Sequence, residues 1–384
     1  MISNVGTWME ITALSYYVAD TSENTWSAVV AAAGFLPTAF LSPVGGAWAD
    51  RFDRRKVLIA SNAASCVIAA AVALTVQTGH ATPLVLAGFS LLGGCVFAVG
   101  FPSFQATLPD LVPKEELVAA IGLSSTQWNL GRILGPAVAA GAIWMGGVSA
   151  ALWMNAASFI VVIAAISAAS IPKSPRTKRL VRQATSDAIE FGRTNPAVRA
   201  MVPLLVTVAF FGGPFIGFVA QMATKVFGSA QGGTSLLIGA QGVGAVVAGA
   251  SMGHLTERFG LRNVTIGWVV ALGPSLVLYG AAPQLWISAL ALAVCGGCYM
   301  GCISSFSSIT QQSAPDALRG RALIINNFAL GVGYPLGLMI QGPLADSTSL
   351  RAVTIASGVA IFGVLLLRRL LQHGFTDPIA TALG

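Results

Sequence analysis

Two ionisable side chains lie well inside long apolar stretches of the sequence, where a charge is costly. Glu10 lies within residues 1–19 and Arg132 within residues 117–143. A charge at the centre of a bilayer costs at least about 2.5–3.5 kcal/mol, so each should face a water-filled cavity or a partner. A carboxyl group in such a place could exchange a proton, and Glu10 and Arg132 are therefore candidates for proton coupling. The alternative is a static salt bridge or a capped polar contact.

Uncharged side chains that could contact a small molecule also lie in or near the apolar stretches. Amides and hydroxyls can form hydrogen bonds, and aromatic rings can stack on an aromatic or apolar compound. The candidates for such contacts are Thr7, Trp128, Asn129, Phe211, Gln241 and Asn326. Each of them could equally be an ordinary helix–helix contact.

Metal and nucleotide chemistry find little support in the sequence. Cys295, Cys298 and Cys302 have helical spacing, but no His or carboxylate accompanies them, which favours packing residues over a metal site. A nucleotide-binding Gly-x-x-x-x-Gly-Lys loop is missing, so ATP is not expected to act directly. The three His residues are scattered, whereas integral membrane enzymes usually cluster their ligands. We expect no metal, no cofactor and no enzymatic activity.

The elements that position these residues are membrane-spanning helices. Of the 384 residues, 55% are hydrophobic and only 9% are charged, whereas soluble domains carry about 25% charged residues. The apolar blocks have the length that a helix needs to cross a bilayer, and a helix satisfies its own backbone groups in lipid. The sequence therefore predicts an all-α, polytopic membrane protein. The twelve predicted spans are 1–19, 27–49, 57–77, 83–105, 117–143, 149–171, 200–223, 234–255, 264–281, 284–308, 322–345 and 349–371.

One long polar segment divides these spans into six and six. The expected organisation is an N-terminal six-helix bundle at 1–171, a cytoplasmic linker at 172–199 and a C-terminal six-helix bundle at 200–384. The middle of the linker, 182–193, could form an amphipathic helix on the membrane surface.

Basic residues predict the orientation of the chain. Most of the 21 Lys and Arg fall in alternate inter-span segments, including the central linker. Because basic loops stay on the cytoplasmic side, both termini are expected to be cytoplasmic, in an inner or plasma membrane. The net charge of +7 lies in short loops between spans, so nucleic acid is not an expected partner.

The two halves of the sequence resemble one another. Three pairs of segments match in the same order: 46–52 with 253–259, 93–95 with 296–298, and 109–110 with 315–316. Parallel six-helix repeats are a known transporter plan, in which substrate binds between the halves near the middle of the membrane.

The most specific motif runs from Gly45 to Lys56, between the second and third spans. It resembles the signature Gly-x-x-x-Asp-Arg-x-Gly-Arg-Arg-Lys or Arg of the major facilitator superfamily, with Trp48 in place of the commoner Leu and Asp53 in place of Gly. Topology, repeat and loop placement extend this resemblance over essentially the whole chain.

The resemblance implies a conformational latch at this loop. Gly46 would let the second span approach a neighbouring helix, and Asp50 could pair with an Arg or with the positive N-terminus of another helix. The implied latch residues are Gly46, Asp50, Arg51, Arg54 and Arg55, with Glu257 and Arg258 as a weaker copy in the second half. Simple anchoring of topology by the basic residues is the alternative.

A second motif lies in the fifth predicted span and consists of Gly131, Gly135, Pro136 and Gly141. It resembles the Gly-Pro motif of drug and metabolite exporters in this superfamily, although any membrane helix kinked by Gly and Pro would look similar. The opening segment 3–9 is similar to a first-span motif of the enterobactin-exporter-like and multidrug efflux group. That motif normally sits midway along the first helix, so the first helix is expected to be truncated.

The resemblance implies a secondary active transporter that works by alternating access. It also implies that the first and fifth spans are close, which would place Glu10 and Arg132 at one central cavity. The expected activity is proton-coupled export of a small, partly apolar molecule, such as a drug or a siderophore-like compound, by a monomer in the lipid bilayer. A metabolite importer or symporter on the same fold, or a non-transporting membrane receptor, are the alternatives.

Overall fold

The computed structural model describes residues 2–113, 116–169, 181–229, 231–315 and 318–371. Within these residues the secondary structure is helical, as the sequence predicts, and the backbone contains no strand. The side chains of some helical residues in these ranges, among them Asp50, Trp128, Asn129 and Arg132, are not described.

The first half of the chain forms long helices joined by short turns. The helices are α1 (Ile2–Thr21), α2 (Asn24–Arg51), α3 (Arg54–Gln77), α4 (Pro83–Thr107) and α5 (Leu117–Ala168). α5 is not one straight rod, because Gly146 and Gly147 have non-helical backbone angles. Gly147 has φ of 74°, which favours glycine, so the chain can turn sharply between two predicted spans.

The linker contains helix α6 (Val181–Thr194), where the sequence predicts an amphipathic helix. Phe191 of α6 is buried together with Val198, Ala314 and Ala322, so the linker helix is fixed to the second half of the chain. Asn195 then caps the next helix, because its side chain accepts hydrogen bonds from the N–H groups of Ala197 and Val198.

The second half begins with a helix that changes its winding several times. α7 (Pro196–Thr207) continues as π-helix over Val208–Gly212, as 3-10 helix over Gly213–Phe218, as the short helix α8 (Val219–Gln221) and as π-helix over Met222–Val226. The remaining helices are α9 (Gln231–Phe259), α10 (Leu261–Ala281), α11 (Leu285–Gln312), α12 (Arg319–Ser347) and α13 (Leu350–Leu371).

Other helices compensate for the irregular winding after α7. The Gln341 side chain on α12 donates its Nε2 hydrogen bond to the carbonyl of Phe210, 2.9 Å away. Ser357 of α13 in turn donates to Oε1 of Gln341 at 3.2 Å. Irregular backbone at membrane depth is tolerated where protein satisfies its polar groups, and this chain of contacts does so here.

Ten helical segments among the described residues are long and apolar enough to cross a membrane. The protein is therefore a multi-pass membrane protein. Helix α1 is not among the ten, and its 20 residues include Ser3, Asn4, Thr7 and Glu10. Residues Ile133–Ala168 of α5 count as one of the ten, although the chain turns within them at Gly146 and Gly147.

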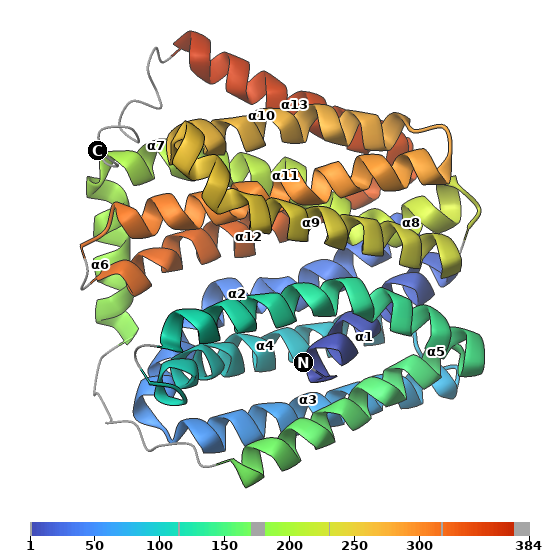
Figure 1. Ribbon diagram of the computed structural model, residues 1–384. Helices are drawn as coiled ribbons and strands as arrows, with labels where there is room; N and C mark the ends of the chain where they lie inside the picture. The colour runs from blue at the N-terminus through green and yellow to red at the C-terminus, as the bar shows by residue number, and fades with distance from the viewer. Residues whose placement is uncertain (1, 114–115, 170–180, 230, 316–317, 372–384) are drawn as a thin grey trace.

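The helices form two groups (Figure 1). In the first, blue to green, α1 packs on α5 and α2 on α4; in the second, yellow to red, α9 packs on α11 and α10 on α13. The groups meet mainly where α2 packs against α12 and α5 against α9. The helices run across the page, with α6 at one end of them. We call that end the linker end and the other, where α2 begins and α12 ends, the distal end.

Candidate functional site at the interface between the two helix groups

Helices α2 and α12 come from opposite halves of the chain and form a close seam. Gly331 of α12 lies directly against Ala39 of α2, and Gly342 lies against Ala28. The Phe35 ring of α2 meets Tyr334 of α12 edge-on, with ring centroids 5.1 Å apart. No local pattern in the sequence indicates this aromatic contact, because its partners lie almost 300 positions apart and belong to different halves.

The seam is closed by polar contacts at the distal end. The Asp346 carboxylate at the end of α12 accepts hydrogen bonds from Asn24 and Thr25 at the start of α2. Lys225 donates a 2.6 Å hydrogen bond to the carbonyl of Ser22, in the turn between α1 and α2. Two charged residues of the second half therefore hold one turn of the first half.

Glu10 finds a polar partner inside the first group. Its carboxylate accepts a hydrogen bond from the side-chain amide of Asn155, which lies in the part of α5 that follows the Gly146 break. Ser158 donates to the carbonyl of Asn155 at 2.7 Å, and Gly6 lies against both Asn155 and Ser158. The predicted partner, Arg132, has a side chain outside the described set. The only indication of Asn155 in the sequence is that it is a single amide in an apolar run.

The Gly-Pro motif mediates the packing of α1 on α5. Gly131 faces the side chains of Asn4 and Trp8, and Gly135 faces the backbone and side chain of Trp8. Pro136 is buried beside them. The close packing expected of such a motif at Gly135 is therefore confirmed, and Gly131 packs in the same way. The same expectation is wrong for Gly141, since nothing lies within 4 Å of its Cβ position.

The two signature glycines near the end of α2, Gly45 and Gly46, differ in their packing. The close approach predicted at Gly46 is wrong, since nothing lies within 4 Å of its Cβ position. Gly45, one residue earlier, instead lies against the backbone of Ala98 and Val99 in α4. One residue turns a helix by about 100°, so the two glycines present different directions to their surroundings.

The basic residues at the start of α3 make contacts within the first group. Arg54 forms an ion pair with Asp110, at the end of the short 3-10 turn that follows α4, and also donates to the carbonyl of Ala106 at 2.7 Å. Arg55 donates to the carbonyl of Ser167 near the end of α5. These contacts tie α3 to α4 and α5. In the sequence, Asp110 is indicated only by its place in a repeated Pro-Asp pair.

The remaining predicted latch residues make few described contacts. Arg51 and Arg258 are exposed and each lies over the ring of the following phenylalanine, Phe52 or Phe259. Glu257 is exposed as well. The Asp50 side chain lies outside the described set, so its latch role stays a prediction.

The candidate substrate contacts separate into three kinds. Gln241 and Asn326 are buried, 4% and 2% exposed, in helix packing. Gln241 packs its backbone on Gly296, and Asn326 accepts a hydrogen bond from Thr310. Phe211 is half-buried, and Thr7 donates to the carbonyl of Ser3. The side chains of Trp128 and Asn129 lie outside the described set.

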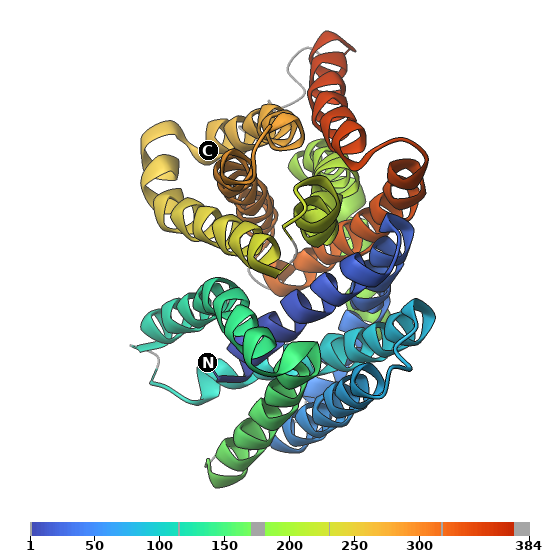
Figure 2. The ribbon, with the colours of Figure 1, turned by 90° about the vertical axis from the view of Figure 1, so that its right-hand side faces the viewer.

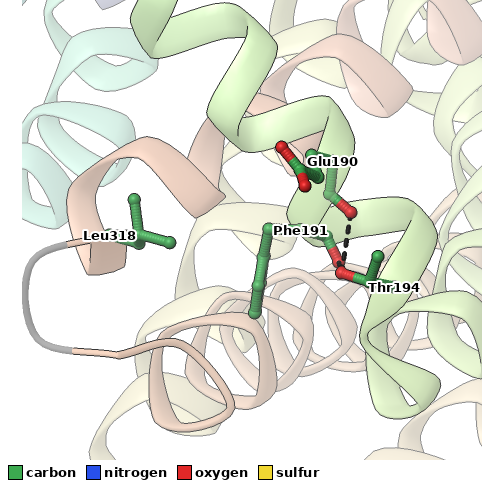
Figure 3. A pocket seen from close by; sticks show the side chains of 4 residues that line it. All are labelled: Glu190, Phe191, Thr194 and Leu318. Carbon is green, nitrogen blue, oxygen red and sulfur yellow. Dashed lines mark hydrogen bonds between the residues drawn. The ribbon is translucent and has the colours of Figure 1, made fainter.

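A pocket lies at the linker end, away from these residues (Figure 3). It is lined by Glu190, Phe191 and Thr194 of α6 and by Leu318, which precedes α12. Thr194 uses its hydroxyl to donate to the carbonyl of Glu190 at 2.8 Å, so this polar group is already engaged. The pocket does not involve Glu10 or the seam between α2 and α12.

Comparison with known proteins places this arrangement in a family. The family model for transmembrane secretion effectors matches residues 1–378. The multidrug efflux pump Tap of Mycolicibacterium fortuitum is 27% identical over 346 residues, which cover 86% of this chain and 83% of the relative. The enterobactin exporter EntS of Escherichia coli O6:K15:H31 is 26% identical over 353 residues, covering 89% and 83%.

Solved structures show the same fold. A crystal structure of a mutant of the nucleoside transporter NupG superposes with a TM-score of 0.79 at 14% identity, covering 96% of this chain and 98% of that chain. At this identity the likeness concerns the fold alone. The family match covers nearly the whole sequence, and this chain belongs to the transmembrane secretion effector family of major facilitator transporters.

Proposed function

We propose that the protein exports a small, partly apolar molecule by alternating access, driven by proton exchange. The observation that carries this proposal is the similarity to Tap and EntS, a multidrug efflux pump and an enterobactin exporter, over more than 80% of the length of each. A drug or siderophore-like compound is therefore the substrate class to test first. We expect no enzymatic activity in a protein of this kind.

The architecture that fits this function has twelve crossings in two six-helix bundles, 1–171 and 200–384, joined by the cytoplasmic linker 172–199. The turn at Gly146 and Gly147 supports the count, because it divides α5 into two crossings. Counting α1 as the first crossing then gives twelve. With the basic linker inside, both termini are cytoplasmic, in the inner or plasma membrane, and the distal end faces outward. We propose that the working unit is a monomer.

Alternating access requires contacts between the halves that can form and break. The seam between α2 and α12 and the contact between α5 and α9 are the interfaces along which such rocking would occur. With the distal end facing outward, as proposed above, the contacts of Asp346 and Lys225 support a state that is closed to the outside.

Glu10 is the proposed coupling carboxylate, with Arg132 as a further candidate. Its contact with Asn155 supplies a neutral partner that can hydrogen-bond the side chain in either protonation state, as donor to a carboxylate or as acceptor from a carboxylic acid. Thr7, Trp128, Asn129 and Phe211 remain candidates for substrate contact. Phe35 and Tyr334 join them, since their rings lie on the seam between the halves.

Efflux can be tested in cells that lack their own pumps. Cells with the protein should accumulate less of a fluorescent cationic dye or a catechol siderophore than cells without it, and a proton uncoupler should abolish the difference. Glu10→Gln should abolish it as well, while Glu23→Gln should not, because Glu23 is an exposed carboxylate before α2. A Glu10→Gln protein that still extrudes substrate against a gradient would contradict coupling at Glu10.

Two other functions remain open to the same assay. An importer or symporter would raise accumulation when a proton gradient is present. A receptor without transport activity would change accumulation in neither direction, and vesicles containing it would show no substrate-stimulated proton flux.

A further inference from the structure

The distal end of the seam contains a helix cap that is supplied from the other half of the molecule. The first N–H groups of a helix lack partners within it, and a side chain at the preceding position usually accepts their hydrogen bonds. Glu23 precedes α2 but makes no such bond. Asp346 of α12 does so instead, with Oδ1 accepting from the N–H of Asn24 at 2.9 Å and Oδ2 from that of Thr25 at 2.8 Å.

The side chains of the same two residues add to this contact. The Asn24 amide donates to Oδ1 of Asp346 at 2.8 Å, and the Thr25 hydroxyl donates to Oδ2. Each carboxylate oxygen thus accepts two hydrogen bonds from residues more than 300 positions away in the sequence. The negative charge also lies at the positive N-terminal end of α2, where it is favourable.

Lys225 makes the complementary contact at the neighbouring helix end. Its ammonium group donates to the carbonyl of Ser22, just beyond the C-terminus of α1. A cation there is favoured by the negative end of the α1 dipole. The turn between α1 and α2 is thus held by two charges of opposite sign, each from the second group of helices. Figure 2 shows the blue helices of the first group beside the orange-red helices of the second.

A buried amide lies one helical turn before Lys225. Helix α8, three residues long, packs against α1 of the first group and α9 of the second. Its Gln221 is fully buried, and neither Nε2 nor Oε1 has a hydrogen-bond partner in the described part of the chain. A buried amide without partners disfavours the packed arrangement, since separation of the helices would let water reach it.

From these contacts we propose that the distal gate is a balance between opposing groups. Asp346 and Lys225, through Ser22, Asn24 and Thr25, hold the gate closed, and the unpartnered amide of Gln221 favours its opening. The inference rests on the alternating-access function proposed above. The residues named here set the fraction of molecules in which the distal end is open.

Distances across the distal end test the balance directly. Spin labels are placed at His80 and Pro283, exposed residues in turns of the first and second halves, in a full-length protein whose five native cysteines are replaced. Electron–electron resonance in lipid nanodiscs then gives the ratio of open to closed molecules. Asp346→Asn should raise this ratio about tenfold, because two charge-assisted bonds to backbone N–H groups weaken.

Three further variants make the test specific. Glu23→Gln removes an equal charge one position before Asn24 and should leave the ratio unchanged. Thr25→Val removes a single donor and should raise it less than Asp346→Asn does. Gln221→Leu, added to Asp346→Asn so that open molecules are abundant, should lower the ratio about three- to tenfold.

Two outcomes would contradict the proposed balance. If Asp346→Asn and Glu23→Gln give the same ratio, or if Gln221→Leu increases opening, the proposed balance is wrong. Should Asp346→Asn not fold, Thr25→Val and Gln221→Leu alone decide the matter. Dye efflux is measured on the same variants: distances that shift as expected without any efflux would leave the gate intact and refute the exporter function, whereas efflux with unmoved distances would refute the gate.

Discussion

Two turns at the linker end of the molecule occupy equivalent places in the two halves, yet they are built differently. The turn between α2 and α3 contains Asp53, with φ of −63°, whose carboxylate accepts hydrogen bonds from the N–H groups of Arg55 and Lys56. The turn between α9 and α10 contains Gly260 at the matching position, with φ of 76° and no side-chain cap. One turn is stabilised by a cap and the other by backbone freedom.

The residues after these turns differ in the same sense. Arg54 begins α3 and forms its ion pair with Asp110, whereas Leu261 begins α10 and is buried, 7% exposed. The start of α3 in the first half is thus held by an ion pair, and the start of α10 in the second half is held by apolar contact. The glycine of the family signature is therefore dispensable in the first half, because Asp53 performs the turn by another mechanism.

The helix crossings behind these turns are, by contrast, shared. α2 crosses α4 where Gly94 lies against the carbonyl of Gly34, and α9 crosses α11 where Gly297, the counterpart of Gly94 in the repeat, lies against the carbonyl of Gly244. Small residues let membrane helices approach to backbone contact, and the two halves use them at corresponding points. The repeat is therefore strict where helices cross and relaxed where loops turn.

The largest expected effect is at a shared crossing. Gly244→Ala places a methyl group onto the backbone of Ala293, which has no flexible end to move aside. The helices must separate, so we expect a loss of about 3 kcal/mol or more and little folded protein, measured by size-exclusion chromatography and thermal unfolding in detergent.

Gly34→Ala is the matched control in the first half. Its added methyl would meet Ser90 at 3.7–3.8 Å, an ordinary contact. Alanine also favours a helix over glycine by up to about 1 kcal/mol, so this variant should be as stable as the parent or more so. Equal losses in both variants would contradict the claim that backbone contact decides the outcome.

These comparisons show what the sequence could and could not predict. Helix positions and the repeat follow from apolar span length and from matching motifs, since both depend on local composition. The sequence did not predict that Gly45 rather than Gly46 approaches α4, because helix rotation relative to neighbours is set by the whole packing arrangement. It did not predict the irregular winding after α7, because the compensating Gln341 lies on α12.

Polar partners across the fold were the hardest to predict. Glu10 stood out because a carboxylate in an apolar stretch is rare, but its partner Asn155 is uncharged and 145 positions away. Asp346 directly follows the predicted span 322–345, where a charged residue is common. Only the approach of α12 to α2 turns it into a helix cap, and no local pattern encodes that approach.

The second prediction concerns the glycine turn. Gly260 combines φ of 76° with ψ of 146°, a region that residues with a Cβ rarely adopt. Gly260→Ala should therefore destabilise the protein by about 1–3 kcal/mol, although nothing lies within 4 Å of the added methyl. Thermal unfolding measures the loss, and Gly253→Ala, in equally open space within α9, is the control that should lose nothing.

The third prediction concerns the ion pair of the first half. Asp110→Ala leaves the Arg54 side chain, 14% exposed, without its carboxylate and should cost about 1–2 kcal/mol after allowance for solvent screening. Replacing both residues, Arg54→Leu with Asp110→Leu, removes both charges of the ion pair together and should recover part of the loss. A double variant less stable than Asp110→Ala would show that apolar side chains cannot take the place of this ion pair.

The smallest expected effect separates the two ways of making the turn. Asp53→Ala removes the cap of α3 and should cost about 1 kcal/mol, because the N–H groups of Arg55 and Lys56 lose their acceptor. Asp53→Gly also removes the cap but should cost only a few tenths of a kcal/mol, as is usual for glycine at this position. Unfolding by SDS in mixed micelles resolves the difference between the two variants. If Asp53→Gly loses as much stability as Asp53→Ala, glycine cannot replace the cap of α3. The turn between α2 and α3 then depends on its carboxylate, whereas the turn at Gly260 does not.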